Sequence, residues 1–198
     1  MNILPRTVST PLGMRKIDFW PITEEPDNAY PKYDKNVNMG AAVLGNLAVT
    51  TVPFSIVGDD IVQEENEVFV GGQIDTETTM DELEVNATLR GHKYSIEDGE
   101  ESSGDDRAPY GGVSFIEEVA KNGKTKTYRA TCLLKTYAMA SSEKQEPATR
   151  KPGEVTPRMY KVSFKVLMAK NRSWRRRKEF ATVEEADAYI NKIFAAAT

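Results

Sequence analysis

The sequence is poor in residues that often carry chemistry, with one cysteine and one histidine in 198 residues. The single Cys132 excludes a disulfide within the chain, and the single His92 excludes a metal site built from several histidines. Long apolar runs are also missing: the uncharged stretch of residues 36–58 contains asparagine, threonine, proline and glycine, unlike the ~20 apolar residues of a membrane span. The first residues lack the basic start and apolar run of a secretory signal. We therefore expect a protein that is assembled in the cytoplasm, without a membrane partner.

What the chain does contain favours one folded domain. Hydrophobic residues make up 39% and charged residues 28% of the sequence, which is too apolar for general disorder. The net charge of −4 conceals an asymmetry, because residues 1–107 carry a net −13 and residues 108–198 a net +9. Opposite charges on different surfaces attract copies of the same chain to one another; the alternative is that the two halves mix in one fold and cancel locally.

The first 45 residues are interrupted by five prolines and predict an extended N-terminal arm with at most one short strand, at residues 17–20. The arm's aromatic residues would need a surface to pack on, either in the same chain or in a neighbour. Residues 46–198 predict a single β domain.

Alternating apolar residues predict a strand from Leu47 to about Ile56, ended by Gly58 and two aspartates. After an acidic link, extended structure is expected to resume over residues 68–74, where the pair Gly71 and Gly72 indicates a bulge or a close backbone approach. Residues 79–91 are ambiguous. Strict alternation over 83–90 favours a strand, whereas Thr79 with Glu82 as a capping box, and Gly91 as a stop, favour a helix.

The second half of the chain is easier to interpret. Residues 97–107 predict an acidic loop, residues 112–119 a strand, and the Asn122-Gly123 pair a tight hairpin turn. The return strand, from about Lys126 to Ala140, places Cys132 among apolar neighbours, where it serves as a small buried side chain.

A long polar loop is expected over residues 141–157, followed by a strand with alternating inward residues: Tyr160, Val162, Phe164, Val166 and Met168. A further strand over 174–180 leads to a C-terminal helix over 183–196. Thr182 and Glu185 would cap this helix, and its apolar stripe would cover a face of the sheet.

Several motifs suggest chemistry but have simpler explanations. Gly123-Lys124-Thr125 lacks the first glycine of a phosphate-binding loop, so a hairpin turn explains it better. Asp59-Asp60 and the acidic residues 97–106 lack the alternating spacing of a calcium loop. No nucleophile motif is present. We therefore expect a protein that is not an enzyme, with no catalytic residues, no cofactor and no metal site.

The basic run of residues 172–178 would suit phosphate or single-strand binding, with Trp174 as a stacking platform. In a strand, however, its charges divide between two faces. Arg176 and Lys178 then lie with Trp174, while Arg175 and Arg177 lie with Glu179.

The order of elements over residues 112–168, with the stretch Ala-Ser-Ser-Glu-Lys-Gln-Glu at 140–146, resembles the major tail protein family of long, non-contractile-tailed bacteriophages. The similarity extends loosely over residues 40–170. It implies a mainly β (α+β) fold: a β-sandwich or partly closed barrel flanked by one or two helices. It also favours the helix over residues 79–90.

The same resemblance implies a structural virion protein, assembled in the host cytoplasm into stacked, hexameric rings that form the hollow tail tube through which DNA passes. Its partners would be copies of itself and other tail proteins, such as the tape measure and the tail terminator. The N-terminal arm and the 141–157 loop would reach neighbouring subunits. An acidic lumen repels phosphate, and some of the following are expected to supply that potential: Glu64, Glu65, Glu67, Asp75, Glu77 and the 97–106 segment. The alternatives are a tube protein of a contractile tail or secretion-like system, and a monomeric nucleic-acid-binding β-barrel.

Overall fold

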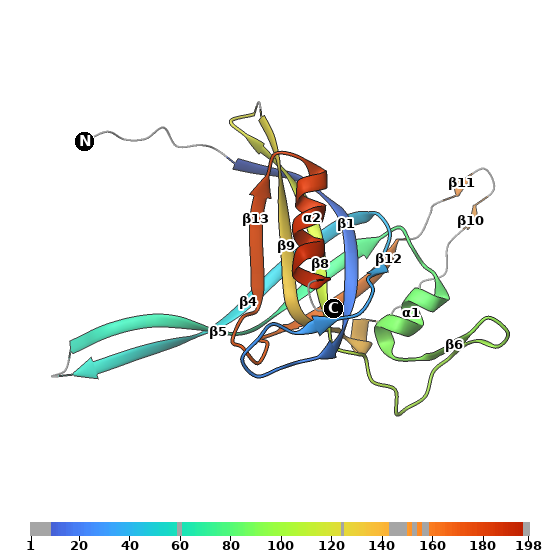
Figure 1. The fold of residues 1–198 in the computed structure, drawn as a ribbon, viewed down its shortest axis with the longest axis horizontal. Helices are drawn as coiled ribbons and strands as arrows, with labels where there is room; N and C mark the ends of the chain where they lie inside the picture. Colours follow the sequence, from blue (N-terminus) through green and yellow to red (C-terminus); the bar gives the residue numbers. More distant parts are fainter. Residues whose placement is uncertain are drawn as a thin grey trace.

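The structure is a computed structural model that describes residues 9–58, 61–123, 125–142, 150–151, 154–155 and 159–195. The mainly β class predicted from the sequence is confirmed, because a large antiparallel sheet of nine strands is accompanied by two helices (Figure 1). The described strands do not form a closed barrel. The elements are β1 (Ser9–Glu24), β2 (Lys32–Tyr33), β3 (Val37–Asn38), β4 (Ala42–Gly58), β5 (Ile61–Thr78), α1 (Leu83–Arg90), β6 (Lys93–Ser95), β7 (Gly99–Glu101), β8 (Gly111–Lys121), β9 (Thr125–Ala138), a 3-10 turn (Ala140–Ser142), β10 (Arg150–Lys151), β11 (Glu154–Val155), β12 (Tyr160–Leu167), β13 (Arg175–Phe180) and α2 (Val183–Phe194).

The main sheet has the strand order β2-β1-β8-β9-β12-β5-β4, with β13 also pairing with β9 and β3 with β1. β9 has two neighbours on one side, because β13 pairs with residues 128–133 and β12 pairs with residues 135–138. Strands from both ends of the chain thus share one sheet.

Strand β1 corrects the expectation of an irregular N-terminal arm with at most one short strand. It runs for 16 residues and pairs with β8 from Ser9 opposite Lys121 to Pro21 opposite Gly111. The prolines are tolerated because of their positions: Pro11 lies beside a register shift and Pro21 at the last pair with β8, where the missing N–H breaks no regular ladder. Residues 1–8 lie outside the described residues.

One core lies on the face of the sheet covered by α2. The predicted Asn-Gly turn between β8 and β9 is confirmed, with φ of 51° at Asn122 and 68° at Gly123. This hairpin places Cys132 fully buried beside Ile190 and Phe194 of α2, as predicted.

The predicted cap of helix α2 is also present, because the Thr182 hydroxyl accepts a hydrogen bond from the Glu185 N–H at 3.2 Å.

A larger core occupies the opposite face, around Phe19 and Phe164. Their rings stack with centroids 5.9 Å apart, although their strands β1 and β12 are three places apart in the sheet. The sheet therefore curls, so that its two ends approach each other. At that approach Met14 of β1 packs against Gly45 of β4, and a Cβ added to Gly45 would overlap the Met14 Cε atom. No ladder joins β1 and β4 among the described strands.

The strands β4 and β5 continue beyond this body as a long two-stranded hairpin, in which residues 51–58 pair with residues 61–69. This hairpin, called the arm below, projects to one side (Figure 1). The arm corrects the expectation of an acidic link after Gly58, because residues 61–67 are part of β5. The bulge predicted at the glycine pair is confirmed: the register shifts between Thr50 opposite Gly71 and Thr51 opposite Phe69. The close approach is confirmed as well, since a Cβ on Gly72 would lie 2.7 Å from the Ala48 carbonyl oxygen.

The ambiguity over residues 79–91 resolves as helix α1, which ends at Gly91 with φ 75°, as the glycine predicted. The capping-box prediction is wrong. Glu82 occupies the N-cap position without a side-chain cap, and the Thr79 hydroxyl instead accepts from the Ala41 N–H at 3.2 Å. Alternation failed here because Val85, Ala87 and Leu89 are buried within a short helix that lies against the body.

The alternation of β12 is confirmed from Tyr160 to Val166, but Met168 lies beyond the strand and is 36% exposed. The polar 141–157 loop falls largely outside the described residues, which include only the end of the 3-10 turn and the short pair β10–β11 within it. In the described part of the chain, neither helix is long and apolar enough to cross a membrane.

Candidate functional site

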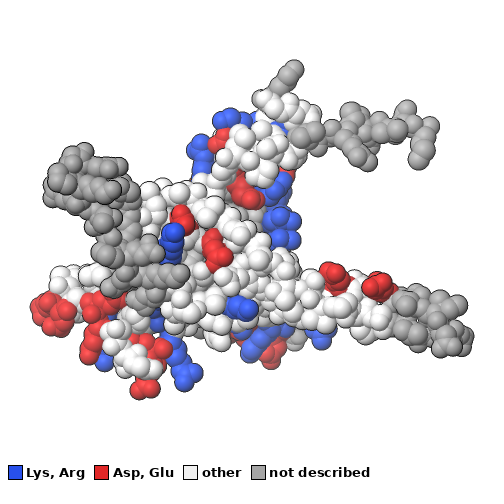
Figure 2. All heavy atoms as spheres, turned by 180° about the vertical axis from the view of Figure 1, so that it is seen from behind, with Lys and Arg blue, Asp and Glu red and all other residues white. Residues whose placement is uncertain are grey.

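The two faces of the projecting arm differ in chemistry. Antiparallel pairing puts residues that face each other on the same side of a hairpin. Val52 pairs with Val68 and Phe54 with Asn66, so one side is largely apolar. Pro53 pairs with Glu67 and Ser55 with Glu65, so the other side is acidic. Figure 2 shows acidic side chains on the arm next to the undescribed tip.

The apolar side of the arm is open to solvent. Phe54 is 53% exposed and Val52 50%, and Val68 and Val70 are similarly exposed. A two-stranded hairpin is marginal on its own in water. The arm thus presents apolar surface that its own chain leaves uncovered within the described residues.

The base of the arm is fixed to the body by stacked rings. Phe69 of β5 lies parallel to Trp174, with centroids 4.3 Å apart, and the Arg175 guanidinium carbon lies 4.2 Å from the centre of the Trp174 ring. Two partners therefore already occupy this ring. A base that stacked on Trp174, as the nucleic-acid-binding alternative requires, would have to displace one of them.

A basic cleft of about 240 Å³ opens between the part of β4 that lies in the body and β13. The face predicted for the basic run is found there: Arg175 and Arg177 share it, while Lys178 on the other face lies over Phe180 at 5.2 Å. The register places Arg177 beside Thr131, and Thr131 beside Phe115. The complete lining is Gly45, Leu47, Phe115, Glu117, Thr131, Arg175 and Arg177.

Glu179, next to the cleft, has two cationic partners, whereas the Arg177 side chain, in the cleft, has none among the described residues. Glu179 accepts from Lys121 Nζ at 2.5 Å and from Arg129 Nη2 at 2.7 Å. Those hydrogen bonds, from Lys121 and then Arg129, hold the pKa of Glu179 below its usual value. By contrast, the Arg177 side chain has neither a hydrogen bond nor an ion pair within the described part of the chain.

Two further features describe the polar groups of the cleft. Burial, and then the neighbouring Arg177, lower the pKa of the Arg175 guanidinium, while the carboxylate of Glu117 acts in the opposite direction. Thr131 is 1% exposed, and its hydroxyl has no hydrogen-bond partner among the described atoms. A buried hydroxyl without a partner is costly.

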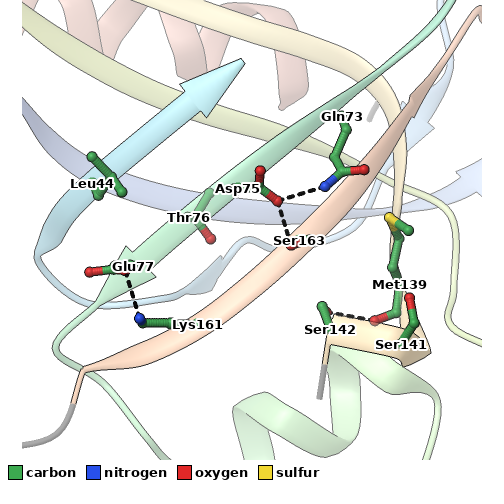
Figure 3. A pocket seen from close by; sticks show the side chains of 10 residues that line it. All are labelled: Leu44, Gln73, Asp75, Thr76, Glu77, Met139, Ser141, Ser142, Lys161 and Ser163. Carbon is green, nitrogen blue, oxygen red and sulfur yellow. Dashed lines mark hydrogen bonds and ion pairs between the residues drawn. The ribbon is translucent and has the colours of Figure 1, made fainter. Parts of the chain in front are cut away.

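A second cavity, of about 330 Å³, lies where β5 and β12 meet the 3-10 turn (Figure 3). Its polar groups are already paired: Asp75 accepts from Ser163 Oγ at 2.5 Å and from Gln73 Nε2 at 2.8 Å, which lowers its pKa. Glu77 pairs with Lys161 at 3.1 Å. The described lining holds carboxylates and hydroxyls without a histidine or cysteine, an arrangement that ties strands together.

The residues expected to supply acidic potential do not gather in one place. Glu65 and Glu67 lie on the arm, Asp75 and Glu77 line the second cavity, and the 97–106 segment lies on and after β6–β7. The Glu64 side chain lies outside the described set. In the 97–106 segment Glu100 accepts from, or shares a proton with, His92 Nδ1 at 2.7 Å, which ties the segment to the end of α1.

The remaining motifs stay local. Burial raises the pKa of the Cys132 thiol to about 12, consistent with a packing role. Asp59, Asp60 and Lys124 lie outside the described residues, and the parts that are described bring together no group of three or more metal-ligating side chains. Sequence reasoning missed the cleft, because Gly45, Phe115 and Thr131 come from three strands whose order only the folded sheet reveals.

No protein-family model matches this chain, and no curated protein matches its sequence.

Proposed function

We propose that this chain is a structural subunit that self-assembles: the major tail protein of a long, non-contractile-tailed bacteriophage, forming stacked rings around a conduit for DNA. The observation that supports this most strongly is the arm. Its apolar side exposes Phe54, Val52 and Val68 on a two-stranded projection that the described body does not cover. Burying such surface against another copy is the ordinary way to stabilise it.

Free strand edges support the same proposal. Of the described strands, β4 pairs only with β5, and β13 only with β9. Edges of this kind pair readily with another chain. In a ring of identical subunits they become paired, and the curled sheet would serve as the sandwich or partly closed barrel that the family resemblance implies.

The charge asymmetry is a third support. Rings that repeat head to tail need different surfaces on their two sides, and the acidic arm and the basic cleft are such a pair. In this proposal the work is mechanical: the subunits build a conduit, and its geometry is their product.

The test removes the arm but keeps Phe69, which fixes the base of the arm to the body. Residues 52–68 are replaced by Asn-Gly, a turn that suits a two-residue hairpin, which retains Phe69 on Trp174. We expect the full chain to form rings or tubes in negative-stain electron microscopy as its concentration rises, and the shortened chain to remain a monomer with an unchanged melting temperature. Tubes from the shortened chain, or small particles of the full chain at every concentration, would contradict the proposal.

A further inference from the structure

The basic cleft presents two arginines that suit a carboxylate. Arg175 and Arg177 both line it, with Arg177 opposite Thr131 and Arg175 opposite Leu133 in the register of β13 and β9. The acidic residue of the lining, Glu117, lies 3.8 Å from Arg129 and also attracts the Arg175 guanidinium. Arginine pairs with carboxylates through two parallel hydrogen bonds, which makes such a pair geometrically specific.

The arm carries the complementary charge. No lysine or arginine occurs between Lys35 and Arg90, so both strands of the arm lack basic residues. Glu65 and Glu67 lie exposed on the arm's acidic side. Glu67 accepts a hydrogen bond from the Thr51 hydroxyl at 2.9 Å, whereas Glu65 has no ion pair among the described residues.

The arm does not reach the cleft of its own chain. β4 lines the cleft at Leu47 and then runs outward, with Pro53 opposite Glu67 and Ser55 opposite Glu65. At about 3.3 Å per residue, these two glutamates lie roughly 20 and 26 Å beyond Leu47 along the strand. The stacking of Phe69 on Trp174 fixes the direction of the arm at its base. An arm glutamate that entered the cleft would therefore come from another molecule.

We propose that the acidic side of the arm of one copy binds the Arg175–Arg177 cleft of the next copy, with Glu65 or Glu67 between the guanidinium groups. This inference rests on the proposed function, because it takes the partner to be a second copy of the chain. Arm and cleft are different surfaces, so every subunit gives one contact and receives one. Contacts of that kind either close into a ring or continue as a filament.

The direct test uses engineered cysteines on separate molecules. Cys132 is buried, so it does not compete for a disulfide. We expect mild oxidation of a mixture of the Glu65→Cys and Arg177→Cys variants to give a disulfide-linked dimer, with much less from either variant alone. The control replaces Arg177→Cys by Lys93→Cys, at an exposed lysine on β6. A mixed dimer no more abundant than in this control would overturn the inference.

A charge-reversal series tests the energetics of the same contact. Arg177→Glu should raise the concentration needed for half-assembly roughly tenfold or more, as expected for a close interfacial charge pair. Glu65→Lys with Glu67→Lys should do the same, and the three changes combined should recover assembly. Lys93→Glu, which changes the charge by the same amount, should leave assembly unchanged. Equal effects of Arg177→Glu and Lys93→Glu would count against the cleft.

The outcomes separate this inference from the proposed function. Tubes without the specific cross-link would leave the function standing and remove the arm-to-cleft contact. The cross-link without rings or tubes would support the contact and contradict the tail-tube function. If Arg177→Glu instead abolishes salt-dependent binding of single-stranded DNA and leaves assembly intact, the cleft is a phosphate site and the inference is wrong.

Discussion

Strand β5 passes through two environments, and their difference separates the part of the molecule that its own chain covers from a part that the described residues leave exposed. Ile74 is fully buried in the body, whereas Val68, six residues earlier on the same strand, is 51% exposed on the arm. The body covers both faces of its sheet, with one core around Phe164 and another around Phe194. The arm has neither cover. One strand thus stabilises the fold in the body and exposes apolar surface on the arm.

The largest expected effect comes from two phenylalanines, one on each side of this division. Phe164→Ala should destabilise the fold by about 3–5 kcal/mol, because it leaves a cavity beside Phe19. Phe54→Ala, at a half-exposed position on the arm, should change the stability of the monomer by less than about 0.5 kcal/mol. Urea denaturation of both variants at a concentration where the chain is monomeric measures the difference. Equal losses would mean that the arm is packed as the body is.

The second prediction locates the boundary itself. Gly72 lies where β5 leaves the body, and a Cβ there would meet the Ala48 backbone oxygen at 2.7 Å, an atom that cannot easily move. Gly72→Ala should therefore cost about 1–3 kcal/mol through overpacking. Gly13, where a Cβ would meet nothing within 4 Å, provides the control, and Gly13→Ala should be neutral. Thermal melts of the two variants that coincide would show that the base of the arm is looser than its geometry indicates.

The smallest expected effect concerns pH. Glu179 has a lowered pKa in the folded state because it accepts hydrogen bonds from Lys121 and Arg129. A depressed acid pKa contributes stability above the unfolded-state pKa, and that contribution is lost as pH falls through the folded-state value. The wild type should thus lose more stability than Glu179→Gln between pH 6 and pH 3, by up to about 1 kcal/mol because the pair is partly exposed.

Glu65→Gln is the matched control for this pH series, because Glu65 lies unpaired on the arm among the described residues. Its stability profile should follow that of the wild type. A Glu65→Gln profile that instead matched Glu179→Gln would indicate an ion pair on the arm within the monomer. Equilibrium unfolding at each pH provides the measurement.

Local signals predicted local structure well. The Asn122-Gly123 turn, the cap at Thr182 and the alternation of β12 each depend on residues close in the sequence. Strand β1 was missed because prolines usually interrupt strands, and only the partner strand β8 reveals that Pro11 lies at a register shift. The outer part of β5 was missed because residues 65–68 are exposed on both faces, so this stretch lacks the alternation of a half-buried strand.

The candidate site could be predicted only in part. Strand periodicity placed Arg175 and Arg177 on one face, which the structure confirms. The cleft in front of them depends on the curl that brings Gly45 and Leu47 of β4 opposite β13, a long-range consequence of strand order. The capping box at Thr79 failed for a related reason, since a distant backbone N–H at Ala41 uses that hydroxyl.

The meeting of Met14 with Gly45 has a mechanical consequence. Side chains alone hold β1 against β4, so this seam can widen without the loss of any ladder hydrogen bond among the described strands. By contrast, the neighbouring strands in the order of the main sheet are joined by backbone hydrogen bonds. If the chain assembles as we propose, a load applied along the arm would be relieved first at this seam, because no ladder hydrogen bond has to break there.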